Sequence, residues 1–158
     1  MSTLQITGGK VLHPDMTVRE GDVLADRKRG RIVEVGDTAS GDETLDASGC
    51  LVTPGLINPH CHAAMTLLRG YADDKPLDAW LQEDIWPVEA ALRAEDVAAG
   101  TRLGAVELLK NGVTAFGDMY FEMSAVADAI ESAGLRARIG HGIVTVGKDA
   151  SEARSDFE

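Results

Sequence analysis

Short alternations of hydrophobic and polar residues dominate the first third of the chain and predict β-strands. Residues 4–12 are rich in apolar side chains, and residues 22–36 place two apolar runs around a basic turn at 27–30. This pattern is typical of a β-hairpin. Residues 46–50 predict a further turn. We therefore expect a small antiparallel β unit that ends near Pro54.

Beyond this point the hydrophobic pattern changes from alternation to a helical spacing, and helical segments are separated by short apolar runs. Such an order of elements predicts parallel strands joined by helical crossovers. The expected strands lie around residue 57, at 113–120 and at 135–146, and the expected helices at 65–70, 76–86, 94–112 and 123–134.

Proline, glycine and serine residues near the ends of the predicted helices help to define these boundaries. Pro76 lies near a predicted helix start, and Pro87 is expected to break or kink the same helix. Gly112 and Gly134 are natural C-terminal caps, and Ser124 is a candidate N-terminal cap.

The most distinctive polar feature is the motif "HCH" at the end of the first apolar run after Pro54. Side chains alternate between the two faces of a strand, so His60 and His62 should share one face while Cys61 faces the other way. Two neutral imidazoles at the carboxyl end of a parallel strand could begin a zinc site. Taken alone, the same pair could also be two structural histidines.

The composition and net charge of the chain indicate which binding partners are unfavourable. The chain has 158 residues, of which 44% are hydrophobic and 26% charged, as expected for a soluble globular protein. Its net charge of -11 is spread along the sequence. An acidic surface repels nucleic acids and anionic membranes, so we expect neither as a partner.

The location of the protein is expected to be cytoplasmic. Two cysteines are too few for a disulfide framework. The N-terminus lacks a basic start followed by an apolar core, so we expect no signal peptide. The sequence also lacks an apolar run long enough to cross a membrane.

The segment "VTPGLINPHCHAAMTLLRGYADDKPLDAWLQEDIWPVEAAL" resembles the first barrel strand and helix of the amidohydrolase superfamily, especially its 5-methylthioadenosine/S-adenosylhomocysteine deaminase and chlorohydrolase-like branch. The later "ELLKNGVTAFGDMYF" resembles the second strand of that barrel and the helix before it. The resemblance implies an α/β fold. Residues 55–158 would form the first three strands of a metal-dependent (β/α)8 barrel, and residues 1–54 the N-terminal part of a small β-sandwich domain.

The resemblance also implies roles for single residues. His60 and His62 match the first two metal ligands, for zinc or alternatively iron or manganese. Glu89 matches a carboxylate that binds ribose hydroxyls, a task suited to an acceptor of two neighbouring donors. Trp86 would line the purine pocket and Arg154 would contact the substrate. From the residues alone, Glu89 and Arg154 also fit surface positions, and Trp86 a core position.

Other candidates carry weaker signals. Asp118 and Tyr120 end the second predicted strand and could face the pocket mouth, although Asp118 could equally cap the next helix. His141 sits between two glycines and fits a core position better than a ligand position. Residues 142–149 imitate a phosphate-binding loop, but an aspartate stands where the magnesium-binding hydroxyl belongs.

The resemblance implies hydrolytic deamination of an adenosine-type nucleoside, such as S-adenosylhomocysteine or 5′-methylthioadenosine, by a full-length protein that is expected to be a homo-oligomer. A complete barrel takes roughly 250 residues, so we expect this chain to be an N-terminal part that lacks the catalytic residues and is inactive alone. The alternatives are a guanine deaminase or triazine hydrolase type of enzyme, and a non-catalytic fragment or subunit that needs a complementing chain.

Overall fold

A computed structural model describes residues 3–142 together with residues 149, 151 and 154. The chain divides into two compact units, Met1–Pro54 and Gly55–Glu158. Most of the loop-like segment 142–149, and the last part of the third predicted strand, lie outside the described residues.

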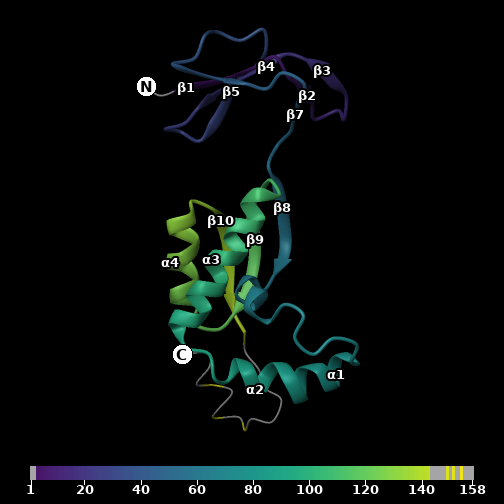
Figure 1. Ribbon diagram of the computed structural model, residues 1–158. Helices are drawn as coiled ribbons and strands as arrows, with labels where there is room; N and C mark the ends of the chain where they lie inside the picture. Colours follow the sequence, from purple (N-terminus) through teal and green to yellow (C-terminus); the bar gives the residue numbers. More distant parts are fainter. Residues whose placement is uncertain (1–2, 143–148, 150, 152–153, 155–158) are drawn as a thin grey trace. The chain divides into compact units, whose positions relative to one another are not determined.

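The first unit consists of strands arranged in two sheets (Figure 1). One sheet has the order β5-β4-β1-β6 and the other the order β3-β2-β7. The strands are β1 (Thr3–Thr7), β2 (Lys10–Leu12), β3 (Val18–Glu20), β4 (Asp22–Asp26), β5 (Arg31–Gly36), β6 (Glu43–Asp46) and β7 (Leu51–Val52).

The predicted hairpin is confirmed, because β4 and β5 pair in antiparallel fashion across the basic turn. The expectation of a purely antiparallel unit is wrong. β6 pairs parallel to β1, and β7 pairs parallel to β2. A pairing between strands far apart in the sequence cannot be recognised from local residues, whereas the tight turn of a hairpin can.

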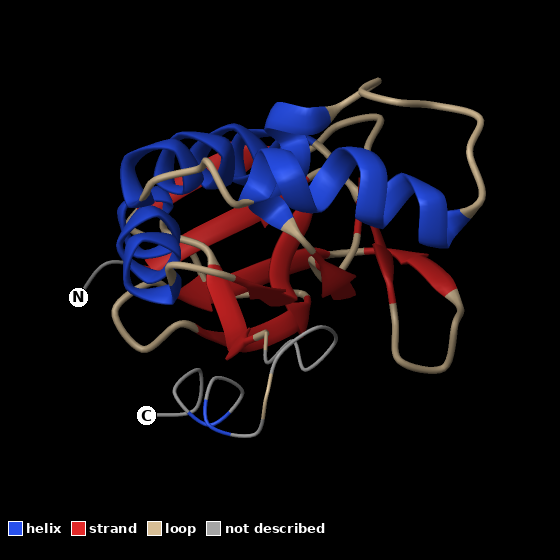
Figure 2. Cartoon of the chain, turned by 90° about the horizontal axis from the view of Figure 1, so that it is seen from below, coloured by secondary structure: helices blue, strands red, loops and turns tan. Residues whose placement is uncertain are grey.

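The second unit is built around the parallel sheet β10-β9-β8. Helices α3 and α4 pack against each other and, together with the short helix η1, against one face of this sheet (Figure 1). Figure 2 shows the loop that leads from η1 to α1. The elements are β8 (Leu56–Cys61), η1 (Ala63–Leu68), α1 (Leu77–Ala79), η2 (Trp80–Ile85), α2 (Trp86–Glu89), α3 (Ala94–Lys110), β9 (Val113–Tyr120), α4 (Met123–Ala133) and β10 (Arg136–His141).

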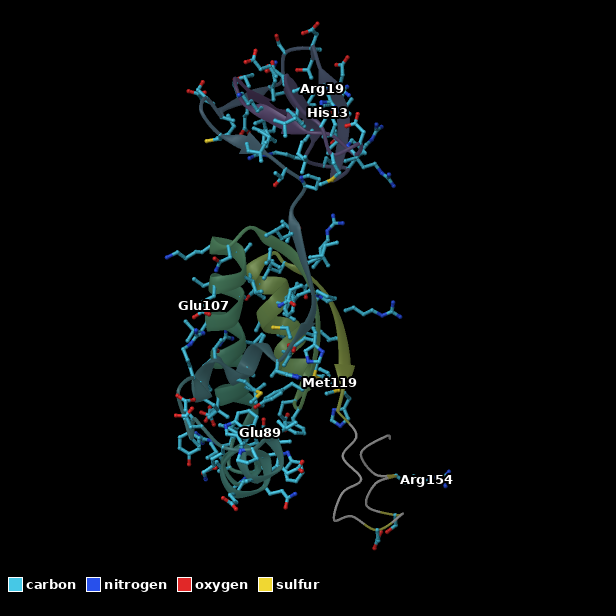
Figure 3. All side chains as sticks on the ribbon, turned by 90° about the vertical axis from the view of Figure 1, so that its right-hand side faces the viewer. His13, Arg19, Glu89, Glu107, Met119 and Arg154 are labelled. Atoms are coloured by element: carbon cyan, nitrogen blue, oxygen red, sulfur yellow. The ribbon has the colours of Figure 1, made fainter. Side chains whose placement is uncertain are left out.

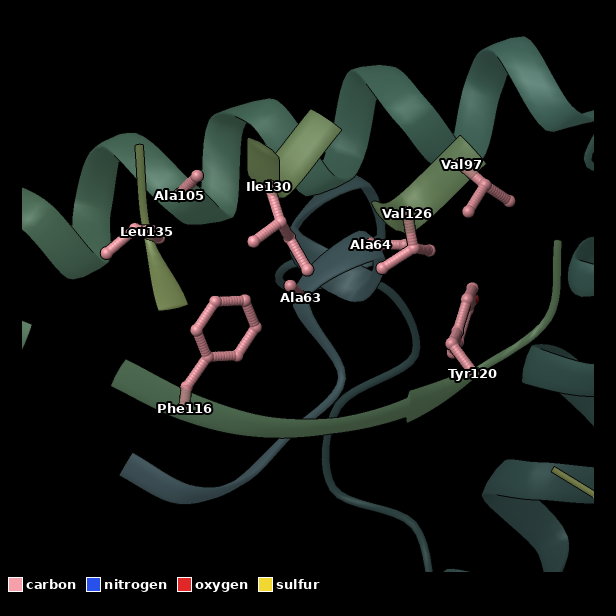
Figure 4. Packing of buried hydrophobic residues seen from close by; sticks show 9 residues of the cluster. All are labelled: Ala63, Ala64, Val97, Ala105, Phe116, Tyr120, Val126, Ile130 and Leu135. Atoms are coloured by element: carbon pink, nitrogen blue, oxygen red, sulfur yellow. The ribbon is translucent and has the colours of Figure 1, made fainter. Parts of the chain in front are cut away.

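A hydrophobic core fills the space between the sheet and these helices (Figure 4). On β9, Phe116 and Tyr120 point into this core and are only 2% and 4% exposed. Met119, between them in the alternation, is 49% exposed on the opposite face. The remaining core residues are Ala63, Ala64, Val97, Ala105, Val126, Ile130 and Leu135.

The predicted break at Pro87 does not occur. The helical backbone continues from α1 through η2 and α2 to Glu89, and η2 is a π-helix. Its wider turn pairs the amide of Trp86 with the carbonyl of Leu81, five residues earlier. Proline cannot donate the usual helical hydrogen bond and its ring collides with the carbonyl four residues before it. A π-helical turn at this point relieves that conflict without ending the helix.

The N-terminus of α4 also differs from the prediction. The residue at the N-cap is Glu122, in the left-handed region at φ 50°, and no side chain caps the helix there. Ser124 lies inside the first turn instead. The predicted C-terminal cap is confirmed, because Gly134 adopts φ 73° after the last helical residue.

Two glycines allow α3 and η1 to touch through their backbones. A Cβ atom on Gly100 would overlap the carbonyl oxygen of Ala64, and one on Gly104 would lie 2.8 Å from the carbonyl oxygen of Ala63. The hydroxyl of Thr66 donates to the carbonyl of Gly100 at 2.7 Å. The start of η1, directly after His62, is therefore held tightly against α3.

Candidate active site

The two histidines of the "HCH" motif converge at the carboxyl end of β8. Their Nε2 atoms lie 3.2 Å apart, and the rings meet edge to face with their centroids 5.0 Å apart. Cys61 faces the other side of the sheet and packs against the core. The alternation expected from the sequence therefore brings His60 and His62 to one point.

The other ring nitrogen of His62 is fixed by strand β9. Its Nδ1 lies 2.7 Å from the backbone carbonyl oxygen of Met119. Because a carbonyl oxygen can only accept, Nδ1 must carry the proton, and the Nε2 of a neutral ring then has a lone pair that can accept a proton or bind a metal. Metal-binding histidines typically donate their second nitrogen in this way.

This geometry fits a shared divalent metal ion. Ligand nitrogens about 2.0–2.1 Å from a tetrahedral zinc lie roughly 3.3 Å from each other, and the two Nε2 atoms are 3.2 Å apart. Within the described residues, no group of three or more His, Cys, Asp or Glu side chains is placed to hold a metal. Two histidines alone are fewer than the three protein ligands that a catalytic zinc usually has.

The histidines open onto a cavity with a volume of about 440 Å³. One side is apolar and comes largely from the helical run after Pro76. Trp86 and Glu89, both expected from the sequence to face a ligand, lie on its lining. The other lining residues are Met65, Leu77, Trp80, Leu81, Ile85, Met119, Tyr120, Phe121 and Gly142.

Glu89 is half-buried in this lining, and the hydroxyl of Tyr120 donates to its Oε1 at 2.8 Å. Figure 3 shows Glu89 on the helical run and Met119 on β9. Burial raises the pKa of Glu89, while the hydrogen bond from Tyr120 opposes that rise. Burial and the neighbouring carboxylate raise the pKa of Tyr120 far above its usual value. Tyr120 is therefore a permanent neutral donor at physiological pH.

Asp118 does not face the cavity and does not cap α4. It is 5% exposed, and its Oδ1 accepts from the amide of Ala63 at 3.2 Å. Its Oδ2 is buried without a hydrogen-bond partner, and burial raises the pKa of the carboxyl group. The side chain thus anchors the backbone immediately after His62 from the core side of the sheet.

The remaining candidates lie elsewhere. Arg154 is exposed and is not part of the described lining of the cavity. His141 is exposed at the end of β10 rather than in the core. Sequence reasoning also missed the carbonyl of Met119, because a backbone group leaves no signature in the residue type. The apolar spacing of Leu77 and Leu81 indicated a helix. That spacing alone cannot show whether their side chains line a cavity or pack in a core.

The sequence profile of the amidohydrolase family matches residues 51–157. The chain belongs to this family. Amidohydrolases are generally metal-dependent, which agrees with the convergent histidine pair. The expected α/β amidohydrolase fold is confirmed by the match and by the parallel sheet.

Related amidohydrolases from archaea align with the whole of this chain. The 5-methylthioadenosine/S-adenosylhomocysteine deaminase of Natronomonas pharaonis is 76% identical over 158 residues, and that of Halobacterium salinarum 67% identical over 156 residues. These alignments cover 100% and 99% of the chain, but only 37% and 36% of the two relatives. The chain thus spans little more than a third of the length of the curated relatives it matches.

Solved amidohydrolase structures resemble the fold. An adenosine deaminase from Xanthomonas campestris with bound zinc superimposes with a TM-score of 0.79 at 40% identity, over 85% of this chain and 32% of that one. A triazine hydrolase variant gives a TM-score of 0.83 at 22% identity, over 92% and 36% of the two chains. The second likeness supports the fold alone. None of the helices in the described part of this chain has the length and apolarity needed to cross a membrane.

Proposed function

We propose that this chain is the N-terminal part of a zinc-dependent hydrolase that deaminates adenosine-type nucleosides. The observation that carries the proposal is one cavity that brings together the convergent pair His60 and His62 and the carboxylate of Glu89. The names of the archaeal relatives support S-adenosylhomocysteine and 5′-methylthioadenosine as substrates. Zinc is supported by the metal in the Xanthomonas campestris structure.

Each group in the cavity has a separate task in this proposal. His60 and His62 would hold the metal through their Nε2 atoms. When bound, the metal supplies Lewis acidity that makes water nucleophilic at neutral pH. Glu89 would accept hydrogen bonds from the two ribose hydroxyls, and Trp86 would cover the purine ring. The groups that transfer protons would come from the part of the relatives that this chain does not span.

The decisive experiment is a hybrid enzyme in which this chain replaces the matching segment of the Natronomonas pharaonis relative. We expect the hybrid to release ammonia from 5′-methylthioadenosine or S-adenosylhomocysteine and to contain about one zinc ion. The native relative is the positive control. A hybrid that folds and binds zinc but deaminates none of these nucleosides would contradict the proposal.

Replacing Glu89 by glutamine in the hybrid is expected to raise KM for 5′-methylthioadenosine about tenfold. The loss corresponds to the roughly 1.5 kcal/mol carried by hydrogen bonds to a charged acceptor. Steady-state kinetics would measure it. The control is Glu107→Gln on α3, because Glu107 forms an ion pair with Arg69 and is not part of the cavity. An equal change in both variants would argue against a ribose contact.

The rival enzyme function is hydrolysis of a small heterocycle, as in guanine deaminases or triazine hydrolases. A flat heterocycle without a sugar gives the Glu89 carboxylate no pair of hydroxyls to bind. Activity of the hybrid on guanine or a chlorotriazine, with none on adenosine compounds, would favour this rival.

The isolated chain of 158 residues is expected to show no turnover and to bind zinc weakly, because two histidines cannot hold a catalytic zinc. Ammonia release and zinc titration would test this. We propose accordingly that the chain requires the remaining two thirds of the enzyme. Tight stoichiometric zinc with measurable deamination by the purified chain would refute that expectation.

A further inference from the structure

The hydroxyl of Tyr120 lies at the junction between the core and the cavity. The residue is 4% exposed and packs in the hydrophobic cluster with Val126 and Ala64 (Figure 4). Its hydroxyl reaches out of that cluster to Glu89, 31 residues earlier in the chain. A ring packed into a hydrophobic cluster in this way cannot move its hydroxyl freely. The phenol oxygen therefore has a fixed position, and its hydrogen bond can orient the Glu89 carboxylate.

Glu89 needs such a support because of its place in the chain. It is the last residue of α2, which follows the π-helical turn, and the next described segment is a turn. A glutamate side chain has three rotatable bonds and loses conformational entropy when it is held in one position. The hydrogen bond from Tyr120 occupies Oε1. A carboxylate has further lone pairs and a second oxygen, so it can still accept from a ligand.

The neighbours of Tyr120 on β9 orient the other part of the site. The carbonyl of Met119 lies 2.7 Å from Nδ1 of His62, and Asp118 accepts from the amide of Ala63, the residue after His62. The end of one strand thus contacts both the histidine pair and the carboxylate. Residues on a single extended strand keep fixed mutual distances. The separation between the metal-binding and sugar-binding groups is accordingly set by β9.

We propose that Tyr120 is a positioning residue for substrate recognition, which holds the Glu89 carboxylate in the orientation that accepts the ribose hydroxyls. This inference rests on the proposed function and deepens it. Tyr120 contacts the carboxylate rather than the reacting atoms, so its loss should weaken binding of the sugar and leave the chemical step intact.

The test uses Tyr120→Phe in the hybrid enzyme, because phenylalanine keeps the packed ring and removes only the hydroxyl. We expect KM for adenosine to rise about fivefold and kcat to change less than twofold. With 2′,3′-dideoxyadenosine, which lacks the two hydroxyls, KM should be unchanged relative to the unmodified hybrid. Tyr71→Phe is the matched control, because Tyr71 is 46% exposed and lies outside the described cavity lining.

A double-mutant cycle with Glu89→Ala separates positioning from a general structural effect. Once Glu89 is alanine, Tyr120→Phe should add no further change in KM for adenosine. Thermal unfolding of each variant would confirm that the fold is intact. Multiplicative effects in the cycle, or an equal rise in KM for both nucleosides, would overturn the positioning role while leaving the proposed function standing. A hybrid that deaminates no adenosine compound would overturn both.

Discussion

Replacing His60 and His62 together by alanine is expected to lower kcat/KM of the hybrid enzyme for 5′-methylthioadenosine at least a thousandfold. The two Nε2 atoms lie 3.2 Å apart and one is oriented by the carbonyl of Met119. Losing both should release the metal. Lewis-acid assistance contributes several kcal/mol, and about 1.4 kcal/mol corresponds to a factor of ten in rate.

Zinc content after dialysis, measured by elemental analysis, provides a readout independent of activity. We expect about one zinc ion in the unmodified hybrid and none in the double variant. His60 is exposed and His62 half-buried, so the variant should keep its fold by circular dichroism. His13→Ala is the control, because His13 belongs to the first unit. A double variant that kept its zinc would rule out this pair as the metal ligands.

Gly100→Ala is expected to lower the free energy of unfolding of the hybrid by about 2 kcal/mol. In an exposed helix, alanine would be favourable by roughly 1 kcal/mol. Here the added Cβ would overlap the carbonyl oxygen of Ala64, and backbone atoms cannot move aside as a flexible side chain can. Overpacking of this kind costs up to about 3 kcal/mol, so the steric term exceeds the gain in helix propensity.

Urea denaturation followed by fluorescence would measure this change. The matched control is Gly140→Ala on β10, where a Cβ would meet nothing within 4 Å. Because η1 begins directly after His62, we also expect weaker zinc binding in Gly100→Ala. Unchanged stability in Gly100→Ala would show that α3 and η1 can separate without cost.

Much of the local structure follows from the sequence. The hairpin β4–β5, the strand β9 and the helices α3 and α4 were predicted from periodicity and turn residues, and the structure confirms them. The exceptions have identifiable causes. Pro87 was expected to break or kink a helix, and the helix does not break there but continues through a π-helical turn. Strands β6 and β7 pair with distant partners in parallel, which no local pattern reveals.

The sequence also placed His60 and His62 on one face, because the alternation of side chains along a strand is a local property. It did not reveal the orienting contacts. The carbonyl of Met119 and the ring of His62 are 57 residues apart, and the hydroxyl of Tyr120 and Glu89 are 31 residues apart. Helical spacing likewise suited Trp86 to either a core or a cavity wall.

The sequence by itself therefore determined the types of the candidate site residues, the shared face of His60 and His62, and the order of strands and helices along the chain. Only the tertiary structure decided which groups meet. In the structure, Asp118 accepts a hydrogen bond from the amide of Ala63 instead of facing the cavity, and the hydroxyl of Tyr120 donates to Glu89. The reason is physical. The face on which a strand side chain lies follows from local alternation along that strand. A hydrogen bond between a strand and a helix depends instead on how the two elements pack against each other.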